Sequence, residues 1–187
     1  MASRRIVVAA LLLALSGAGD AVAQDRELAA LEAEAREQFL DGLYGAADES
    51  IRIAIAEANP EDFNRLILFQ GLVASRLAAD GENAADGRAI IGMAVEHSRD
   101  GSWPRPVIDY LLGAKGLQNV ANAIRISGVS NAAKEQRLCE LSFYAGAFAV
   151  NDGEQAFAAR LLDKALATCP AGHPLRPLAE SERGRLE

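Results

Sequence analysis

The segment CELSFYAGAFAVNDGEQAFAARLLDKALATCPAG, residues 139–172, decides the fold of this chain. Alanine, leucine and phenylalanine recur in it at the three- and four-residue spacing of amphipathic helices. A turn ending at Gly153 divides it into two helical segments, because glycine permits the tight turn between antiparallel helices. Gly146 and Ala158 are small enough for the two helices to cross closely. Pro170 ends the second helix, since proline cannot continue it.

The composition of the 187-residue chain favours helices throughout. Half of its residues are hydrophobic, which excludes a disordered chain. Threonine occurs once, at Thr168, and aromatic residues make up only 5% of the chain. Strands favour β-branched and aromatic side chains, whereas alanine, abundant here, has the highest helix propensity. The sequence therefore predicts an all-α protein and excludes a β-sandwich or β-barrel.

Apolar residues keep a helical spacing along the rest of the chain, where glycine, proline and asparagine separate the segments. The predicted helices cover residues 27–40, 46–58, 61–79, 84–96, 104–112, 117–126, 132–150, 154–168 and 176–186. Ser130 or Asn131 is expected to cap the 132–150 helix. Small or apolar residues recur at steps of 38, 35 and 38 residues, at Ala47, Ala85, Val120 and Ala158. We therefore expect about four antiparallel helical hairpins, stacked as a right-handed solenoid with a C-terminal capping helix.

The first 23 residues have the pattern of a secretory signal peptide. Arg4 and Arg5 precede an uncharged apolar run, Ile6–Leu15, and small residues up to Ala23 form the expected cleavage site. The run is too short to span a membrane, which takes about twenty apolar residues. We therefore expect the mature chain to be periplasmic or secreted, with no membrane span.

Two cysteines, Cys139 and Cys169, remain in the mature chain. An even pair in an oxidising compartment favours a disulfide. The start of the first helix and the end of the second lie side by side in an antiparallel pair, so a 139–169 bridge is expected; free buried thiols are the alternative. His97 and His173 lack a metal-ligand spacing relative to the cysteines, so no metal site and no cofactor are expected.

The 139–172 unit matches the tetratricopeptide (TPR) pattern, in which two antiparallel helices form a repeat of about 34 residues. The matching positions are Gly146, Gly153, Ala158, Leu162, Ala165 and Pro170. Together with Trp103-Pro104 and Tyr110–Gly113, this unit makes the C-terminal half of the chain, about residues 103–187, resemble bacterial exported TPR proteins, including lipoproteins of the new-lipoprotein-I kind. The resemblance implies one TPR-like domain over residues 24–187 and an adaptor role that gathers cell-wall hydrolases and a protease. Lipid anchoring is not implied, because no cysteine lies near the cleavage site.

A TPR solenoid presents a concave groove lined by the first helix of each repeat. The pattern places these residues in the groove: Arg36, Phe39, Arg65, Leu68, Arg76, Glu140, Phe143 and Asn151. Arginine side chains there would meet the carboxylates of a bound peptide, and an asparagine its backbone. The alternative is that the three arginines form a solvated or internally salt-bridged face.

Two further residues have alternative interpretations. Trp103, the one tryptophan of the chain, either anchors a partner or packs the start of the helix that follows it. His173 lies between a glycine and a proline, and we expect it to be exposed in a loop.

The sequence shows no motif for catalysis. Its glycine-rich stretches lack the lysine of a phosphate-binding loop, and no Gly-x-Ser-x-Gly elbow occurs. A net charge of −7 argues against nucleic acid as a partner. We therefore expect a non-enzymatic adaptor or scaffold that binds a protein or peptide, with envelope or cell-wall enzymes as candidate partners. The alternatives are a periplasmic all-α enzyme or small-ligand-binding protein with a helical pocket, and self-association through the repeat ends.

Overall fold

The computed structural model describes residues 23–81, 86–97 and 102–187, and all regular secondary structure in these ranges is helical. The helices are an N-terminal helix (residues 23–40), α2 (Tyr44–Glu57), α3 (Phe63–Ala79), α4 (Gly87–Ala94) with a 3₁₀ turn (Val95–His97), α5 (Arg105–Leu111), α6 (Leu117–Ile126), α7 (Asn131–Asn151), α8 (Gln155–Thr168) and α9 (Leu175–Gly184). The prediction of an all-α protein is confirmed. Residues 1–22 of the predicted signal peptide lie outside the described ranges.

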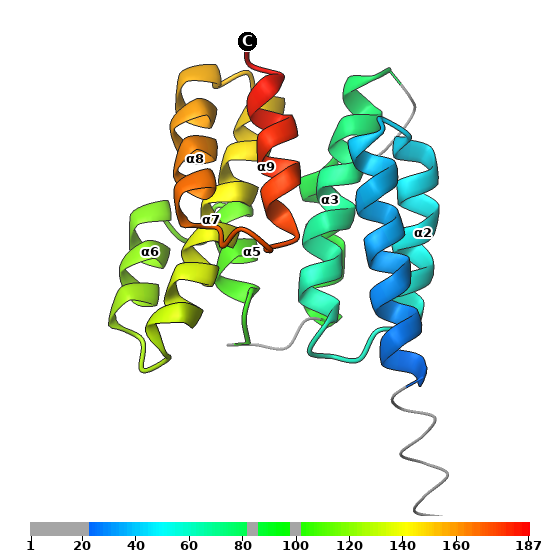
Figure 1. Cartoon of the computed structure of the whole chain (residues 1–187), viewed down its shortest axis with the longest axis horizontal. Helices are drawn as coiled ribbons and strands as arrows, with labels where there is room; N and C mark the ends of the chain where they lie inside the picture. The colour runs from blue at the N-terminus through cyan, green and yellow to red at the C-terminus, as the bar shows by residue number, and fades with distance from the viewer. Residues whose placement is uncertain (1–22, 82–85, 98–101) are drawn as a thin grey trace, which may run out of the picture.

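The helices form two groups that lie side by side (Figure 1). One group holds the N-terminal helix, α2 and α3, and the other holds α6, α7, α8 and α9. The two groups meet where α3 contacts α7, while α9 packs on both α7 and α8. The hydrophobic core continues from the N-terminal helix to α9. None of the helices in the described ranges combines the length and the apolar character that a membrane crossing requires.

The α7–α8 hairpin forms as its sequence predicts. The Ser130 hydroxyl caps α7 by accepting a hydrogen bond from the backbone N–H of Ala133 at 3.2 Å. Gly153 has φ +76° in the turn between the helices, a conformation that glycine adopts without steric cost. A Cβ added to Gly146 would lie 2.9 Å from Cγ of Leu162, so only glycine allows the helices to cross this closely.

Glycine also allows the close approach of α3 and α4. A Cβ on Gly71 of α3 would lie 2.6 Å from Cδ1 of Ile91, and a Cβ on Gly87 of α4 would overlap the carbonyl oxygen of Gly71. Both hairpins therefore place glycine in the first helix at the point of closest approach to the second.

The predicted disulfide is present. The sulfur atoms of Cys139 and Cys169 lie 2.01 Å apart, and the bond joins α7 to the end of α8. Among the described residues no cysteine is free. The bridge closes a loop of 30 residues, which reduces the conformational entropy of the unfolded chain and stabilises the hairpin.

Candidate functional site

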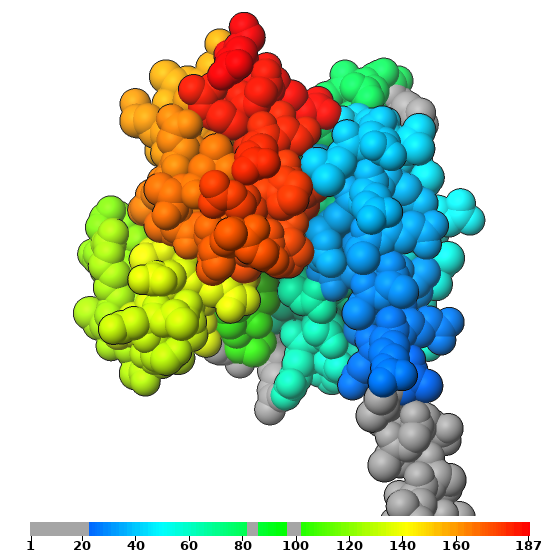
Figure 2. Space-filling model, viewed as in Figure 1, coloured from blue at the N-terminus to red at the C-terminus, as the bar shows by residue number. Residues whose placement is uncertain are grey.

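A cavity of about 470 Å³ opens between the N-terminal helix, α3, α7 and the loop that joins α8 to α9. Figure 2 shows the face on which this loop approaches the N-terminal helix. The cavity is lined by Glu32, Arg36, Arg65, Phe69, Gln136, Glu140, Tyr144, Pro170, Gly172, His173, Pro174 and Leu175. Its volume falls in the range of about 300–1,000 Å³ that small-molecule sites occupy.

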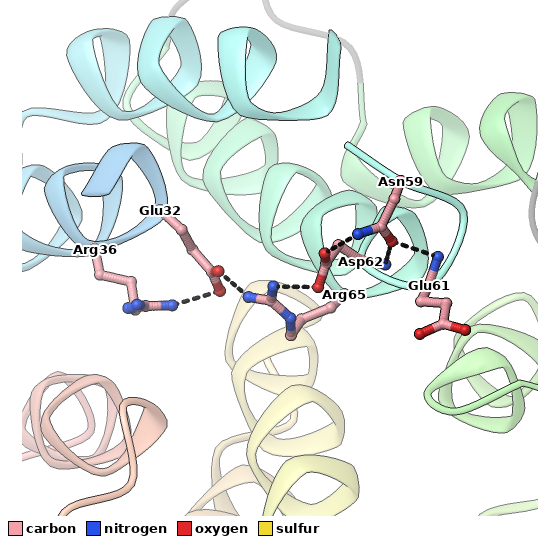
Figure 3. A network of polar contacts seen from close by, with 6 residues as sticks. All are labelled: Glu32, Arg36, Asn59, Glu61, Asp62 and Arg65. Atoms are coloured by element: carbon pink, nitrogen blue, oxygen red, sulfur yellow. Dashed lines mark hydrogen bonds and ion pairs between the residues drawn. The ribbon is translucent and has the colours of Figure 1, made fainter. Parts of the chain in front are cut away.

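Two arginines share one buried carboxylate in the lining of the cavity. Glu32 of the N-terminal helix accepts from Arg36 Nη1 at 2.5 Å, and its second oxygen pairs with Arg65 of α3 (Figure 3). Arg65 also donates to Asp62 at 2.8 Å. Burial removes water from both guanidinium groups and lowers the pKa of Arg36 and Arg65, because it disfavours their charged forms.

The turn before α3 holds this arrangement in place. The side-chain oxygen of Asn59 accepts the backbone N–H groups of Glu61 and Asp62, at 2.8 and 3.0 Å. Its amide nitrogen donates to the carboxylate of Asp62 at 2.8 Å (Figure 3). This turn therefore orients the Asp62 carboxylate that receives the Arg65 guanidinium.

Glu140 of α7 also lines the cavity. It is buried and accepts hydrogen bonds from Trp103 Nε1 at 2.6 Å and from Gln136 at 3.1 Å. Its Oε1 lies 3.8 Å from Nε2 of His173. Trp103 also packs against the core and lies under the guanidinium of Arg137. The packing interpretation of Trp103 is therefore the one that the structure supports.

Tyr144 lines the cavity within reach of the charges of Glu140, Arg65 and Arg36. Its ring is buried, and burial together with the nearby Glu140 carboxylate raises the pKa of its hydroxyl far above its ordinary value. The hydroxyl therefore stays neutral at physiological pH and can both donate and accept a hydrogen bond. Phe69 and Leu175 add apolar surface beside it.

Three of the predicted groove residues, Arg36, Arg65 and Glu140, come together at this cavity. Three others do not. Phe39, Leu68 and Phe143 are at most 1% exposed and lie in the core, so their prediction as groove residues is corrected. Their spacing places them on one face of a helix, and this is the basis of the prediction. In α3 and α7, however, neighbouring helices cover several faces.

Arg76 and Asn151 also lie away from the cavity. The buried guanidinium of Arg76 pairs with Glu182 of α9, donates to the Asn151 side chain, and reaches the carbonyl of Ala147. The alternative of internal salt bridges therefore holds for Arg76, and it also holds for Arg36 and Arg65, which pair with Glu32 and Asp62. Glu182, which the sequence analysis missed, is fully buried. Burial raises its pKa despite the opposing effect of Arg76.

His173 differs most from its prediction. Only 9% of its side chain is exposed, because the loop after α8 folds it onto α7. Its Nδ1 lies 3.6 Å from the Cys139 sulfur. Across the described residues, Cys139, Cys169 and His173 form the one group of potential metal ligands whose ligand atoms lie within 4.8 Å of one another. Linear spacing missed this group because 34 residues separate Cys139 from His173.

Comparison of the chain with known protein families, curated proteins and solved structures found no match. No relative therefore bears on the TPR-type solenoid or on the adaptor role.

Proposed function

We propose that this protein is a non-enzymatic, TPR-like adaptor that binds a segment of another polypeptide in the cavity between the N-terminal helix, α3 and α7. The observation that carries the proposal is the pairing of two half-buried arginines with an adjoining apolar surface. A guanidinium has five N–H donors. In the part of the chain that the structure describes, Arg36 uses one and Arg65 two on carboxylates. The remaining donors are available to a ligand.

The chemistry of the cavity suggests what kind of segment it accepts. A carboxylate of the bound segment would meet Arg36 and Arg65, where charge-assisted hydrogen bonds replace the water that burial has removed. An apolar side chain next to it would cover Phe69 and Leu175, and Gln136 would bond to the backbone. The volume suits one or two side chains of a longer segment rather than a whole folded partner.

The predicted location supports the same proposal. A disulfide persists in oxidising compartments such as the bacterial periplasm, and Cys139–Cys169 is formed. Together with the signal-peptide pattern of residues 1–23, this favours an exported protein. Envelope or cell-wall enzymes are then the candidate partners, as the resemblance to exported TPR proteins implies.

The test is capture of partners from an extract of the native envelope, with two matched arginine variants. Arg65→Gln removes a cavity charge, whereas Arg52→Gln removes the charge of an arginine on α2 whose side chain is 70% exposed. We expect Arg65→Gln to lose polypeptide partners that the wild type and Arg52→Gln both retain. Retention of every partner by Arg65→Gln would contradict the proposal.

A second candidate is a small-molecule site in the same cavity. It is favoured by the presence of three groups with shifted pKa, Arg36, Arg65 and Tyr144, around one open cavity. A screen of small carboxylates by thermal shift separates the two candidates. Binding at 100 times the dissociation constant stabilises a protein by about 2.7 kcal/mol. A compound with that effect on the wild type and none on Arg65→Gln would favour the small-molecule site.

A further inference from the structure

The disulfide has a buried histidine beside it. Cys139 and Cys169 are at most 4% exposed. The His173 side chain, on the loop between α8 and α9, is 9% exposed. The potential ligand atoms of these three residues all lie within 4.8 Å of one another. Thiolate and imidazole are the ligands that zinc prefers, so this cluster has the composition of a zinc site as soon as the sulfurs are reduced.

The distance between sulfur and nitrogen also fits a tetrahedral metal ion. Zinc bonds of about 2.3 Å to sulfur and about 2.0 Å to nitrogen set the ligand atoms about 3.6 Å apart in tetrahedral geometry. Cys139 Sγ and His173 Nδ1 are 3.6 Å apart. Two thiolates around the same ion lie about 3.8 Å apart, a separation that the sulfurs can adopt once the covalent bond between them is broken.

The hydrogen bonds of the His173 imidazole place Nδ1 as an acceptor on the side of the sulfurs. The backbone N–H of Leu175 donates to Nδ1 of His173 at 3.3 Å, so Nδ1 presents its lone pair in this arrangement. Nε2 faces the Glu140 carboxylate at 3.8 Å. A carboxylate that accepts from the second ring nitrogen is the usual support of a metal-bound histidine, and Glu140 lies slightly beyond the 3.5 Å limit of such a hydrogen bond. Trp103 and Gln136 hold that carboxylate in place through their own hydrogen bonds.

We propose that the reduced protein binds one Zn²⁺ through Cys139, Cys169 and His173, and that the disulfide and the metal exclude each other. A dithiol reductant transfers two electrons and two protons to the disulfide and becomes a disulfide itself. The two cysteine thiols then release two protons as they bind Zn²⁺ as thiolates. The ion replaces the Leu175 N–H as the partner of Nδ1. The cavity borders His173, so it gives the ion and a fourth, exchangeable ligand access to the site.

This arrangement would keep the C-terminal hairpin joined in both redox states. The disulfide links α7 to the end of α8 in the oxidised protein, and the ion would link the same two cysteines in the reduced protein. The metal ligands include neither Arg36 nor Arg65, although His173 and Glu140 also line the cavity of the proposed peptide site. Arg65→Gln should therefore leave Co²⁺ binding unchanged, which separates the two proposals.

The test uses the full chain, reduced with a phosphine, which is converted to its oxide and does not compete for metal as a thiol does. Titration with Co²⁺ is expected to give one ion per chain, with thiolate-to-cobalt charge-transfer bands and the visible bands of tetrahedral cobalt. Zn²⁺ should displace the Co²⁺. The oxidised protein should show none of these bands.

Three variants make the test specific. We expect His173→Ala to weaken Co²⁺ binding at least tenfold, and Glu140→Gln to weaken it about 10–100-fold, as removal of a supporting carboxylate does. Glu180→Gln, which removes an exposed carboxylate on α9, should leave binding unchanged. The proposal is overturned if the reduced wild type shows no thiolate band or if His173→Ala binds Co²⁺ as tightly as the wild type. It is also overturned if reduction unfolds the chain and Zn²⁺ does not restore its helical circular dichroism.

Discussion

The buried ion pair between Arg76 and Glu182 is expected to be costly to break and cheap to replace. The two residues are 106 positions apart in the chain. They join α3 to α9, and their side chains are 4% and 0% exposed. Removal of Arg76 leaves the Glu182 carboxylate with only the longer pairing to Arg185 at 3.5 Å, and removal of Glu182 leaves the buried guanidinium with only neutral oxygens. Loss of one partner of a buried ion pair costs about 3–5 kcal/mol. Replacement of both by apolar residues removes the two desolvation penalties together, so the double variant can be as stable as the wild type.

The assay is a double-mutant cycle with Arg76→Met and Glu182→Leu. The free energy of unfolding is measured by chemical denaturation, with far-ultraviolet circular dichroism as the signal. We expect each single variant to lose about 3–5 kcal/mol and the double variant to lose less than either single variant. The loss of the Asn151 contact with Arg76 adds a smaller cost to each variant that lacks the arginine.

A similar pair on the surface provides the control. Arg88 and Asp152 form two hydrogen bonds, at 2.7 and 2.6 Å, and their side chains are 33% and 37% exposed. Arg88→Met should therefore cost about 1–2 kcal/mol, the sum of the half-exposed ion pair, the hydrogen bond to the Leu111 carbonyl and the contact with the Phe148 ring. The reasoning is refuted if Arg76→Met costs no more than Arg88→Met, or if the losses of the two buried single variants simply add in the double variant.

Three further predictions concern the hairpin and the pH dependence of stability. Replacement of Cys139 and Cys169 by serine should lower the free energy of unfolding by about 3–4 kcal/mol, the entropy effect of a 30-residue loop, and a loss below about 1 kcal/mol in denaturant titration would contradict it. Gly146→Ala should cost about 1–3 kcal/mol, because its methyl group would lie 2.9 Å from a side-chain carbon of α8, whereas Gly128→Ala meets no atom within 4 Å and should be close to neutral in the same titration. Because burial raises the pKa of Glu182, the native state binds that proton more tightly than the unfolded chain does, so its contribution to stability is lost as the pH rises from 4.5 through the raised pKa. Glu182→Gln should remove this loss, and an unchanged pH profile of the unfolding free energy would contradict the cause given.

Local sequence determined most of the helices. Ser130, Gly146 and Gly153 act through contacts within one hairpin, so their spacing was enough to predict the cap, the close crossing and the turn. The disulfide followed from the same hairpin, because the antiparallel arrangement brings the two cysteines together.

The sequence was less informative about the faces of the central helices. Leu68 in α3 and Phe143 in α7 each belong to a series of apolar residues at helical spacing. This spacing shows that one face of the helix is apolar, but it does not show what covers that face. Because α3 and α7 are packed against several helices, residues on a face predicted to be open are in fact in the core. A helix that is apolar on more than one face is the signal that could have distinguished these positions.

Long-range polar partners could not be predicted for a related reason. Glu182 reaches Arg76 across 106 residues, and His173 reaches Cys139 across 34. Both contacts depend on how α9 and the loop before it return to α3 and α7, which no local spacing encodes. The cavity could not be predicted for the same reason. Its lining brings Arg36 and Arg65 near Glu140 and the loop of His173, which are distant in the sequence.

Site-specific photocrosslinking in cells that export the protein tests the central claim most directly. A photoreactive residue replaces Gln136, which is exposed at the cavity, or Ile126, which is 85% exposed on α6 and does not line it. We predict that the position 136 variant forms a covalent adduct with a polypeptide, that the position 126 variant does not, and that Arg65→Gln abolishes the adduct. Equal adducts at both positions, or an adduct at 136 that survives Arg65→Gln, would contradict the assignment of this cavity as the binding site.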